Sequence, residues 1–518
     1  MAAIRPLLAS LGLALCFMMS PVRAETVLRI VPQSDLRVLD PHATQATITH
    51  IFGLMIYDTP YSFDEAMVPH PQMIGATKIS DDRLSYEFTL RDGLKFNSGQ
   101  PVTAADVVAS LTRGARQDPL MQLMMKRLAR MEPIDARAFR LVLAKPFAYV
   151  EAALASPGAV VMRAEDMLAS GDKPMTTTMG SGPFRFVPAG YTPGARITFD
   201  RNPDYIPRDE PADGNAGGKR VKVDRVEWNV IPDLQTRVGA LQKGEVDLLD
   251  QLPHDGIQSL AKRADIVIEP SSKLGNLAFL RINTLHPPFN DVRARRALAM
   301  LVNQPDYLSA AFTTDSTWWR ECFSFFGCGT PNGSEAGSDA YRKPDPARAK
   351  ALLAEAGYRG EKIVILTSQE IPLIGALAEV TGDALRSIGV NVDMQTSDWG
   401  TLVVRRARQD APEKGGWHIF QSGADVSSLT NPATNILVDA RCDRNNYVGW
   451  PCSEALEAMR TEMIDAPTPA KLDGYSRALW SELPSLILGQ YRQPVAYRKS
   501  ITGLTHGQYL AFWNIEKK

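Results

Sequence analysis

The stretch from residue 362 to residue 421 decides the fold class, because short apolar runs alternate in it with longer amphipathic runs. The short runs are "KIVILT" (Lys362–Thr367), "VNVDMQ" (Val390–Gln395) and "WHIFQ" (Trp417–Gln421). Between them lie "PLIGALAEVTGDALRS" (Pro372–Ser387) and "WGTLVVRRAR" (Trp399–Arg408). This order predicts strand–helix–strand–helix–strand. Such units form an α/β fold with a mostly parallel sheet covered by helices, and ligands gather at the carboxyl ends of the strands.

The same alternation of strands and helices extends outward from this stretch. Apolar and polar residues alternate in Ser85–Leu90, which predicts a half-buried strand. Thr103 and Asp106 have the spacing of a capping box at the start of a helix. A further helix is predicted over Asp345–Ala356, with Gly357 ending it in the left-handed conformation.

Composition limits the class of protein. The chain has 518 residues, of which 44% are hydrophobic and 22% charged, as in ordinary globular proteins. The 57 Lys and Arg residues balance 58 Asp and Glu residues, leaving a formal charge of −1. We therefore expect no attraction to nucleic acid or to an anionic membrane. The length suggests about three or four folding units.

The first 24 residues have the pattern of a secretory signal peptide. Arg5 precedes the apolar run Leu7–Met19, and a small-residue site ends at Ala24. A run of about 13 apolar residues is too short to span a bilayer, which argues against a membrane anchor. Cys16 suggests a lipoprotein, but Leu15 stands before it where a small residue is required. We expect cleavage after Ala24 and export in soluble form.

Four cysteines remain after the signal peptide: Cys322, Cys328, Cys442 and Cys452. An even number in an oxidising compartment predicts disulfides, and four cysteines allow three pairings. The local pairing, Cys322 with Cys328 and Cys442 with Cys452, closes two short loops that contain glycine, and we favour it. The alternative is a zinc site of four thiolates. It lacks the usual C-x2-C spacing.

Motifs for catalysis are nearly absent. Ser170 and Lys173 have the S-x-x-K spacing of penicillin-recognising enzymes, but Gly171 and Pro174 disrupt the helix that the motif needs. The sequence contains no G-x-S-x-G, H-E-x-x-H, phosphate-binding or dinucleotide-binding motif, and the seven histidines have no metal-ligand spacing. We predict no catalytic residue, no metal site and no cofactor. An exported hydrolase remains the alternative reading.

A longer segment resembles the signature of a known protein family. "YEFTLRDGLKFNSGQPVTAADVVASLTR" (Tyr86–Arg113) resembles the signature of the extracellular solute-binding proteins of family 5, which serve dipeptide, oligopeptide and nickel ABC importers. Further blocks follow in the order typical of that family: "GSGPFRFV" from residue 180, "ITFDRNPDY" from 197, "FLRINTLHPPFNDVRARRALAMLVN" from 279 and "DPARAKALLAEAGY" from 345. The resemblance covers essentially the whole chain after the signal peptide.

The resemblance implies the two-lobed type II fold of periplasmic binding proteins, with a two-stranded hinge and an additional subdomain on lobe one. Mapped onto this chain, lobe one takes residues 25–281 and 494–518, with the subdomain at about 68–179. Lobe two takes residues 282–493. Such lobes close on a ligand by hinge motion, and closure is selected by ligand contacts with both lobes.

The resemblance also implies a ligand site on lobe two. In the family's peptide binders an Asp after a strand pairs with the ligand's α-ammonium, and "FQSGADVSS" places Asp425 in that role, preceded by Ser422, Gly423 and Ala424. The alternative is that Asp425 only caps a turn or helix. The family's peptide binders often have a Trp before this Asp and a shorter loop after it, so dipeptide specificity stays open.

Four further residues are weaker candidates for the walls of the site, each with the alternative of a core or surface role. They are Tyr57 and Thr44 on lobe one, and Trp318 and Trp399 on lobe two.

The function that the resemblance implies is capture of a short peptide or peptide-like solute for an ABC importer, in the periplasm. The expected partners are that ligand and an inner-membrane permease, with no nucleic acid, and the protein is expected to be a monomer that is not an enzyme. Binding of nickel, haem or another solute, and a sensory or chaperone use of the same fold, are the alternatives.

Overall fold

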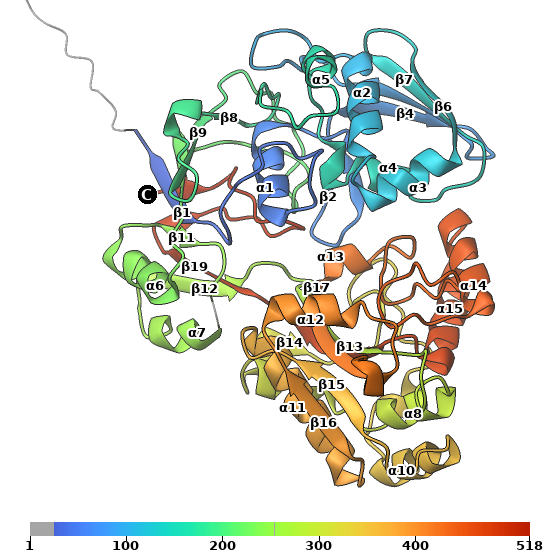
Figure 1. Ribbon diagram of the computed structural model, residues 1–518. Helices are drawn as coiled ribbons and strands as arrows, with labels where there is room; N and C mark the ends of the chain where they lie inside the picture. Colours follow the sequence, from blue (N-terminus) through green and yellow to red (C-terminus); the bar gives the residue numbers. More distant parts are fainter. Residues whose placement is uncertain (1–24, 253) are drawn as a thin grey trace, which may run out of the picture.

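The computed structural model describes residues 25–252 and 254–518. The predicted signal peptide lies outside the described residues. Figure 1 shows an upper lobe, which corresponds to lobe one, and a lower lobe, which corresponds to lobe two. Each is built on its own β-sheet. Among the described helices, none combines the length and the apolar character needed to cross a bilayer.

The upper lobe is built on a mixed sheet that, among the described residues, has seven strands in the order β12-β19-β11-β1-β10-β9-β8. Helix α1 packs on it, with Phe52 at 5.9 Å from Phe199 between ring centroids. The elements are β1 (Val27–Val31), α1 (Thr47–Ile56), β2 (Tyr61–Phe63), β3 (Pro69–Pro71), β8 (Phe184–Phe186), β9 (Arg196–Arg201), β10 (Arg225–Asn229), α6 (Leu234–Lys243), β11 (Leu248–Leu249), α7 (His254–Leu260), β12 (Ile266–Pro270), β19 (Pro494–Arg498), β20 (Ile501–Thr502) and β21 (Glu516–Lys517).

A subdomain with an antiparallel sheet of order β4-β5-β7-β6 extends from the upper lobe. The predicted alternation in β5 is confirmed, because Tyr86, Phe88 and Leu90 are buried. The capping box of α2 is also confirmed: Asp106 N donates to Thr103 Oγ1, and Thr103 N donates to Asp106 Oδ2. The elements are β4 (Ile74–Ile79), β5 (Ser85–Leu90), α2 (Ala104–Gly114), α3 (Pro119–Arg127), β6 (Leu128–Pro133), β7 (Ala138–Leu143), α4 (Val150–Leu154) and α5 (Ala164–Ser170).

The lower lobe has a sheet that, within the described chain, runs β14-β18-β13-β17-β15-β16. The predicted strand–helix alternation is confirmed, since β15 pairs in parallel with β16 and β17. The sheet is mixed, however, because β13 runs antiparallel to both β17 and β18. The elements are β13 (Asn276–Ile282), α8 (Val292–Ala299), α9 (Gln304–Ala311), β14 (Trp319–Arg320), α10 (Pro346–Glu355), β15 (Ile363–Thr367), α11 (Pro372–Ser387), β16 (Val392–Thr396), α12 (Trp399–Arg406), β17 (Ile419–Asp425), α13 (Val426–Leu429), α14 (Glu454–Asp465), α15 (Pro469–Glu482) and β18 (Leu486–Tyr491).

The chain crosses between the two large sheets twice, after β12 and after β18. The crossings lie side by side, because Ser271 N donates to Gln493 O at 2.8 Å. Gly275 has φ +64°, and a Cβ there would lie 2.2 Å from Tyr491 O, so a larger residue would separate the crossings.

The sheets shift one expected lobe boundary. The expected boundary places residues 276–281 in lobe one, but they form most of β13, which pairs within the lower sheet. A local pattern cannot give this boundary, because β13 joins the lower sheet through pairing with β17 and β18, which lie far along the chain. We propose that lobe two begins after the crossing at residues 271–275.

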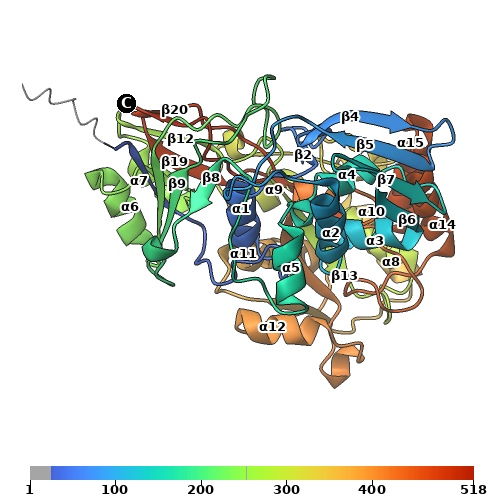
Figure 2. The same cartoon turned by 90° about the horizontal axis from the view of Figure 1, so that it is seen from above.

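The subdomain contacts the lower lobe directly. Ala148 N donates to Ile464 O at 3.0 Å, and the Arg127 guanidinium pairs with the Asp465 carboxylate. Viewed from above in Figure 2, the subdomain strands lie over the same side of the molecule as α14 and α15. The two lobes are therefore in contact at the rim that lies away from the crossings.

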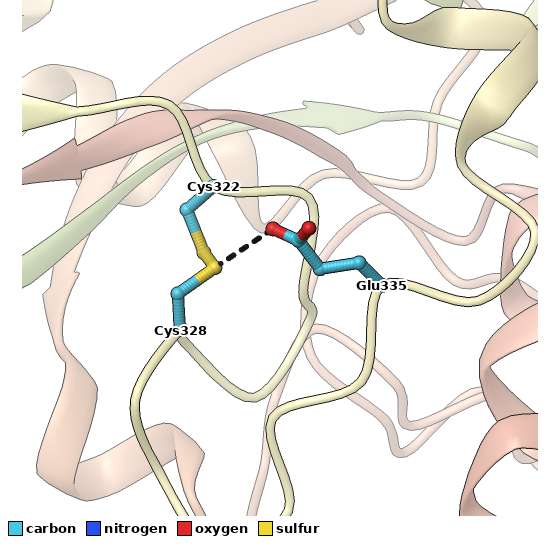
Figure 3. A group of neighbouring side chains, drawn as sticks. All are labelled: Cys322, Cys328 and Glu335. Atoms are coloured by element: carbon cyan, nitrogen blue, oxygen red, sulfur yellow. Dashed lines mark hydrogen bonds between the residues drawn. A yellow bond between two sulfur atoms is a disulfide. The ribbon is translucent and has the colours of Figure 1, made fainter.

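Both predicted disulfides are confirmed, Cys322–Cys328 and Cys442–Cys452. In Figure 3 a Glu335 carboxylate oxygen lies 3.1 Å from Cys328 Sγ. A carboxylate beside two cysteines resembles a metal site, but both sulfurs are bonded to each other and neither is a thiolate. The zinc alternative is wrong for these four residues.

Candidate ligand-binding site between the lobes

A cavity of about 630 Å³ lies between the two lobes, and we call it the proximal chamber. Its walls come from segments that are far apart in sequence, on both sides of the crossings. The lobe-two wall consists of Asn276, Ala424, Asp425, Ser427, Ser428 and Tyr491. The lobe-one wall and the crossings supply Gln33, Gln45, Thr47, His50, Ile51, Asp250, Gln251, Ser271, Ser272, Gln493, Gly507, Gln508, Tyr509 and Leu510.

Asp425 lies at the end of β17 and faces this chamber. Its Oδ1 accepts a hydrogen bond from Ser427 N at 2.8 Å, so the same carboxylate is the N-cap of α13. The side chain is open to the cavity, yet the surrounding walls remove water, and this desolvation raises the pKa of Asp425 above its usual range. Hydrogen bonding from Ser427 opposes that rise in pKa. The carboxylate thus both caps the helix and is available to a ligand.

The residues before Asp425 hold the wall together. Ala424 lines the chamber. A Cβ on Gly423 would lie 2.6 Å from the Tyr491 hydroxyl, so glycine permits Tyr491 to approach β17 and form the wall. Ser422 pairs in register with Phe279 of β13 and lines neither this cavity nor the second one described below. Of the predicted stretch, Ala424 and Asp425 therefore face the ligand space.

A histidine and a tyrosine form the centre of the lobe-one wall. His50 Nδ1 and the Tyr509 hydroxyl are 3.2 Å apart, and His50 Nε2 is 3.2 Å from Thr44 O. Burial lowers the pKa of His50 to about 4, so the imidazole is neutral at neutral pH. Thr44, a predicted wall residue, acts here through its backbone carbonyl, which orients His50.

Asp250 lies on the same wall, directly after the carboxyl end of β11. Its side chain accepts a hydrogen bond from Gln33 N at 3.2 Å. The residue is 6% exposed, and burial raises the pKa of Asp250 to about 6, although the bond from Gln33 opposes the rise. The chamber therefore has a carboxyl group on each lobe.

A second cavity, of about 480 Å³, opens from the first between the subdomain and lobe two, and we call it the distal chamber. The two chambers share Gln45, His50, Ser427, Ser428, Gln508 and Tyr509. The distal walls include two acidic residues, Asp118 and Glu151. Among the described residues that line either chamber there is no Lys or Arg. The combined space is therefore electrically negative.

The three aromatic wall candidates lie elsewhere. Tyr57 is 1% exposed in the lobe-one core, and Trp318 is buried in lobe two. Trp399 begins α12 and packs against the Arg406 guanidinium, 5.4 Å from its ring centroid. None of the three lines either chamber. Tyr57 and Trp318 are buried inside their lobes, and Trp399 is partly buried on α12.

Sequence reasoning missed His50, Asp250, Tyr491 and Tyr509. Two of them carried a usable signal, because Asp250 directly follows a buried strand and Tyr491 ends one. Polar residues at strand ends are where α/β folds place their ligands. His50 and Tyr509 had no such signal, since 459 positions separate the two partners.

Residues 68–442 match the family model of the bacterial extracellular solute-binding proteins, family 5 Middle. The chain belongs to this family. A relative in Sinorhizobium fredii, named "Probable peptide ABC transporter periplasmic-binding protein y4tO", is 39% identical over 504 residues, which is 96% of this chain and 94% of the relative.

Solved structures share the fold. A dipeptide binding protein from Pseudoalteromonas sp. SM9913, in complex with Met-Leu, superposes with a TM-score of 0.74 at 21% identity, covering 95% of this chain and all of that one. The protein AgaA from A. tumefaciens R10, in complex with agropinic acid, gives a TM-score of 0.75 at 22% identity, covering 95% of this chain and 99% of that one. These two proteins with a similar fold are thus in complex with different ligands.

Proposed function

We propose that this family 5 chain is the substrate-binding component of an ABC importer, which captures a short peptide or peptide-like solute between its lobes. Membership of the family and the 39% identical relative, whose name refers to peptide transport, support the importer role. The interlobe position of the chamber supports capture by lobe closure, since a ligand there touches both lobes.

The observation that carries the peptide assignment is Asp425 in a chamber without a basic wall. A carboxylate facing a water-poor cavity favours a cationic partner, because the pair replaces the hydration that each group loses. The α-ammonium of a peptide fits that requirement. The four carboxyl groups of the combined space favour a cation further.

Binding and release, with no bond broken, complete the proposal. The closed form delivers the ligand to an inner-membrane permease in the periplasm, after cleavage behind Ala24, and the protein works as a monomer.

Nickel capture is the weaker alternative, because both ring nitrogens of His50, the histidine that lines the chambers, already have partners.

The experiment is isothermal titration of the purified protein with di- and tripeptides and with their N-acetylated forms, after native mass spectrometry for co-purifying molecules. N-acetylation removes the ammonium and leaves the rest of the peptide. We expect free peptides to bind and acetylated ones to lose at least about tenfold in affinity. Equal affinities would contradict the role of Asp425 and favour a ligand that has no ammonium.

A further inference from the structure

Glu151 is a half-buried carboxylate in the wall of the distal chamber, on α4 of the subdomain. Within the described chain it has neither a hydrogen-bond donor nor an ion-pair partner. Its neighbour Asp118 differs, because it caps α3 and accepts hydrogen bonds from Leu120 N and Met121 N, both at 3.0 Å. A partly desolvated carboxylate without a partner is unfavourable, and a cation in the chamber would relieve that cost.

The rest of the distal chamber is suited to a carbon chain. Its apolar wall residues include Phe63, Met67, Leu120, Ala152 and Pro331. Long basic side chains combine an aliphatic stem with a charged end, and they bury the stem along apolar surface. The described lining offers no Lys or Arg to pair with an anion. The chamber therefore suits a basic group on an aliphatic stem better than an apolar or acidic group.

We propose that the distal chamber binds a guanidinium or ammonium group on an aliphatic stem, with Glu151 as its charge partner. On the proposed peptide function, on which this inference rests, the group is an Arg or Lys side chain of a peptide whose α-ammonium lies at Asp425. The shared wall of His50 and Tyr509 separates the two cation positions. The ligand then carries two positive charges, one for each chamber.

The distal chamber is formed by both lobes. Glu151 comes from the subdomain, whereas Asn332 and Asn431 come from lobe two. Ala148, three positions before Glu151, donates its N–H to Ile464 O of lobe two. A basic group held at Glu151 therefore adds a ligand contact that favours the closed arrangement.

The test compares arginine with citrulline, which has nearly the same shape and no charge. Three tripeptides carry Arg at the first, second or third position among alanines, and three carry citrulline instead. Isothermal titration measures all six with the wild type, Glu151→Gln and the control Glu132→Gln, a half-buried carboxylate of the same subdomain that lines neither chamber. A melting curve checks the folding of each variant.

At one position we expect Arg to bind about tenfold or more tightly than citrulline to the wild type and to Glu132→Gln. Glu151→Gln should abolish that preference and weaken citrulline binding far less than Arg binding. Equal binding of Arg and citrulline at every position, or a preference that survives Glu151→Gln, would overturn the inference while leaving peptide capture intact.

A failure of all six peptides to bind would contradict the peptide proposal instead. The inference is then decided by agmatine, a guanidinium on a four-carbon amine. Binding of agmatine to the wild type that Glu151→Gln weakens about tenfold supports the distal cation position without peptides. No binding, or binding that Glu151→Gln leaves unchanged, overturns both proposals.

Discussion

The two walls of the proximal chamber are built in different ways. On lobe two, Asp425 is fixed by Ser427, two positions along the chain, and by the strand that ends in it. On lobe one, Asp250, His50 and Tyr509 come from three segments that meet only in the folded molecule. The placement of the Asp425 carboxylate therefore depends on local geometry, whereas the placement of Asp250, His50 and Tyr509 depends on long-range packing.

This difference predicts how each wall fails. A substitution at Asp425 in lobe two should remove only what that side chain does, because β17 and α13 on either side of it remain folded. A change that loosens lobe one should displace several wall residues together. The predictions below test this contrast, from the largest expected effect to the smallest.

The largest effect is expected from a buried ion pair in the core of lobe one. Lys219 Nζ lies 2.8 Å from Asp58 Oδ1 with both side chains fully buried, and the ammonium lies 4.8 Å from the Trp513 ring centroid. Lys219→Met leaves the Asp58 charge unpaired, which should lower the free energy of unfolding by about 3–5 kcal/mol. Urea unfolding measures the loss.

The matched control removes both charges. Lys219→Met combined with Asp58→Leu should recover part of the stability, because no buried charge is left alone. A single variant that loses less than about 1 kcal/mol would mean that the lobe-one wall does not depend on this pair.

The second prediction separates the two roles of Asp425. Asp425→Ala should weaken a peptide ligand by roughly a hundredfold or more, because a buried charge loses its partner, and should cost about 1 kcal/mol of stability through the lost cap. Asp425→Ser keeps a capping oxygen and loses the charge, so it should retain stability and still lose affinity. Titration calorimetry and melting curves give the two quantities. If Asp425→Ser binds the peptide with the affinity of the wild type, Asp425 only caps α13 and does not bind the ligand.

The third prediction concerns the pH dependence of stability in the ligand-free protein. Burial raises the pKa of Asp250 to about 6, so the folded state holds this proton more tightly than the unfolded state. Stability from this group is greatest at about pH 4 and falls as the pH rises through about 6. Asp250→Asn keeps the shape without the charge and should be about 3 kcal/mol more stable than the wild type at pH 8. If the wild type and Asp250→Asn have equal free energies of unfolding at every pH from 4 to 8, this prediction is wrong.

The smallest effect is expected at His506, beside the crossings. A hydrogen bond to Glu269 raises the pKa of His506, and its Nδ1 lies 3.3 Å from Ser271 O. This contribution to stability is complete below the ordinary pKa of about 6.5 and is lost as the pH rises through the raised value. His506→Gln should lose less than about 1 kcal/mol at pH 6 and nothing at pH 9, because the pair is partly exposed. A loss that is the same at both pH values would assign His506 a packing role instead.

The fold could be predicted where the signal was local. Helix α11 begins at Pro372 and ends at Ser387 as the pattern predicts, and the Thr103–Asp106 capping box begins α2. Capping and amphipathic spacing involve residues within a few positions of each other, so one sequence contains the whole signal.

The site could be predicted only in part, for the same reason. Ala424 and Asp425 are the last two residues of a recognisable strand, and both line the chamber. Glu151 and Tyr509 have no local pattern, because their place in the walls results from how the subdomain and the C-terminal segment pack. Trp399 was misleading, since an aromatic residue near a strand end is as well suited to packing on its own helix.

The place of β19 in the upper sheet has a consequence for biosynthesis. This strand, residues 494–498, lies between β11 and β12 and pairs with both, although it follows the lobe-two elements in the chain. A chain emerging from the ribosome therefore cannot complete its first lobe until nearly all of the second has been translated. Contacts across so long a separation form slowly, and a slowly folding precursor stays extended for longer. We expect that moving this strand to the front of the gene, by circular permutation, would speed folding of lobe one.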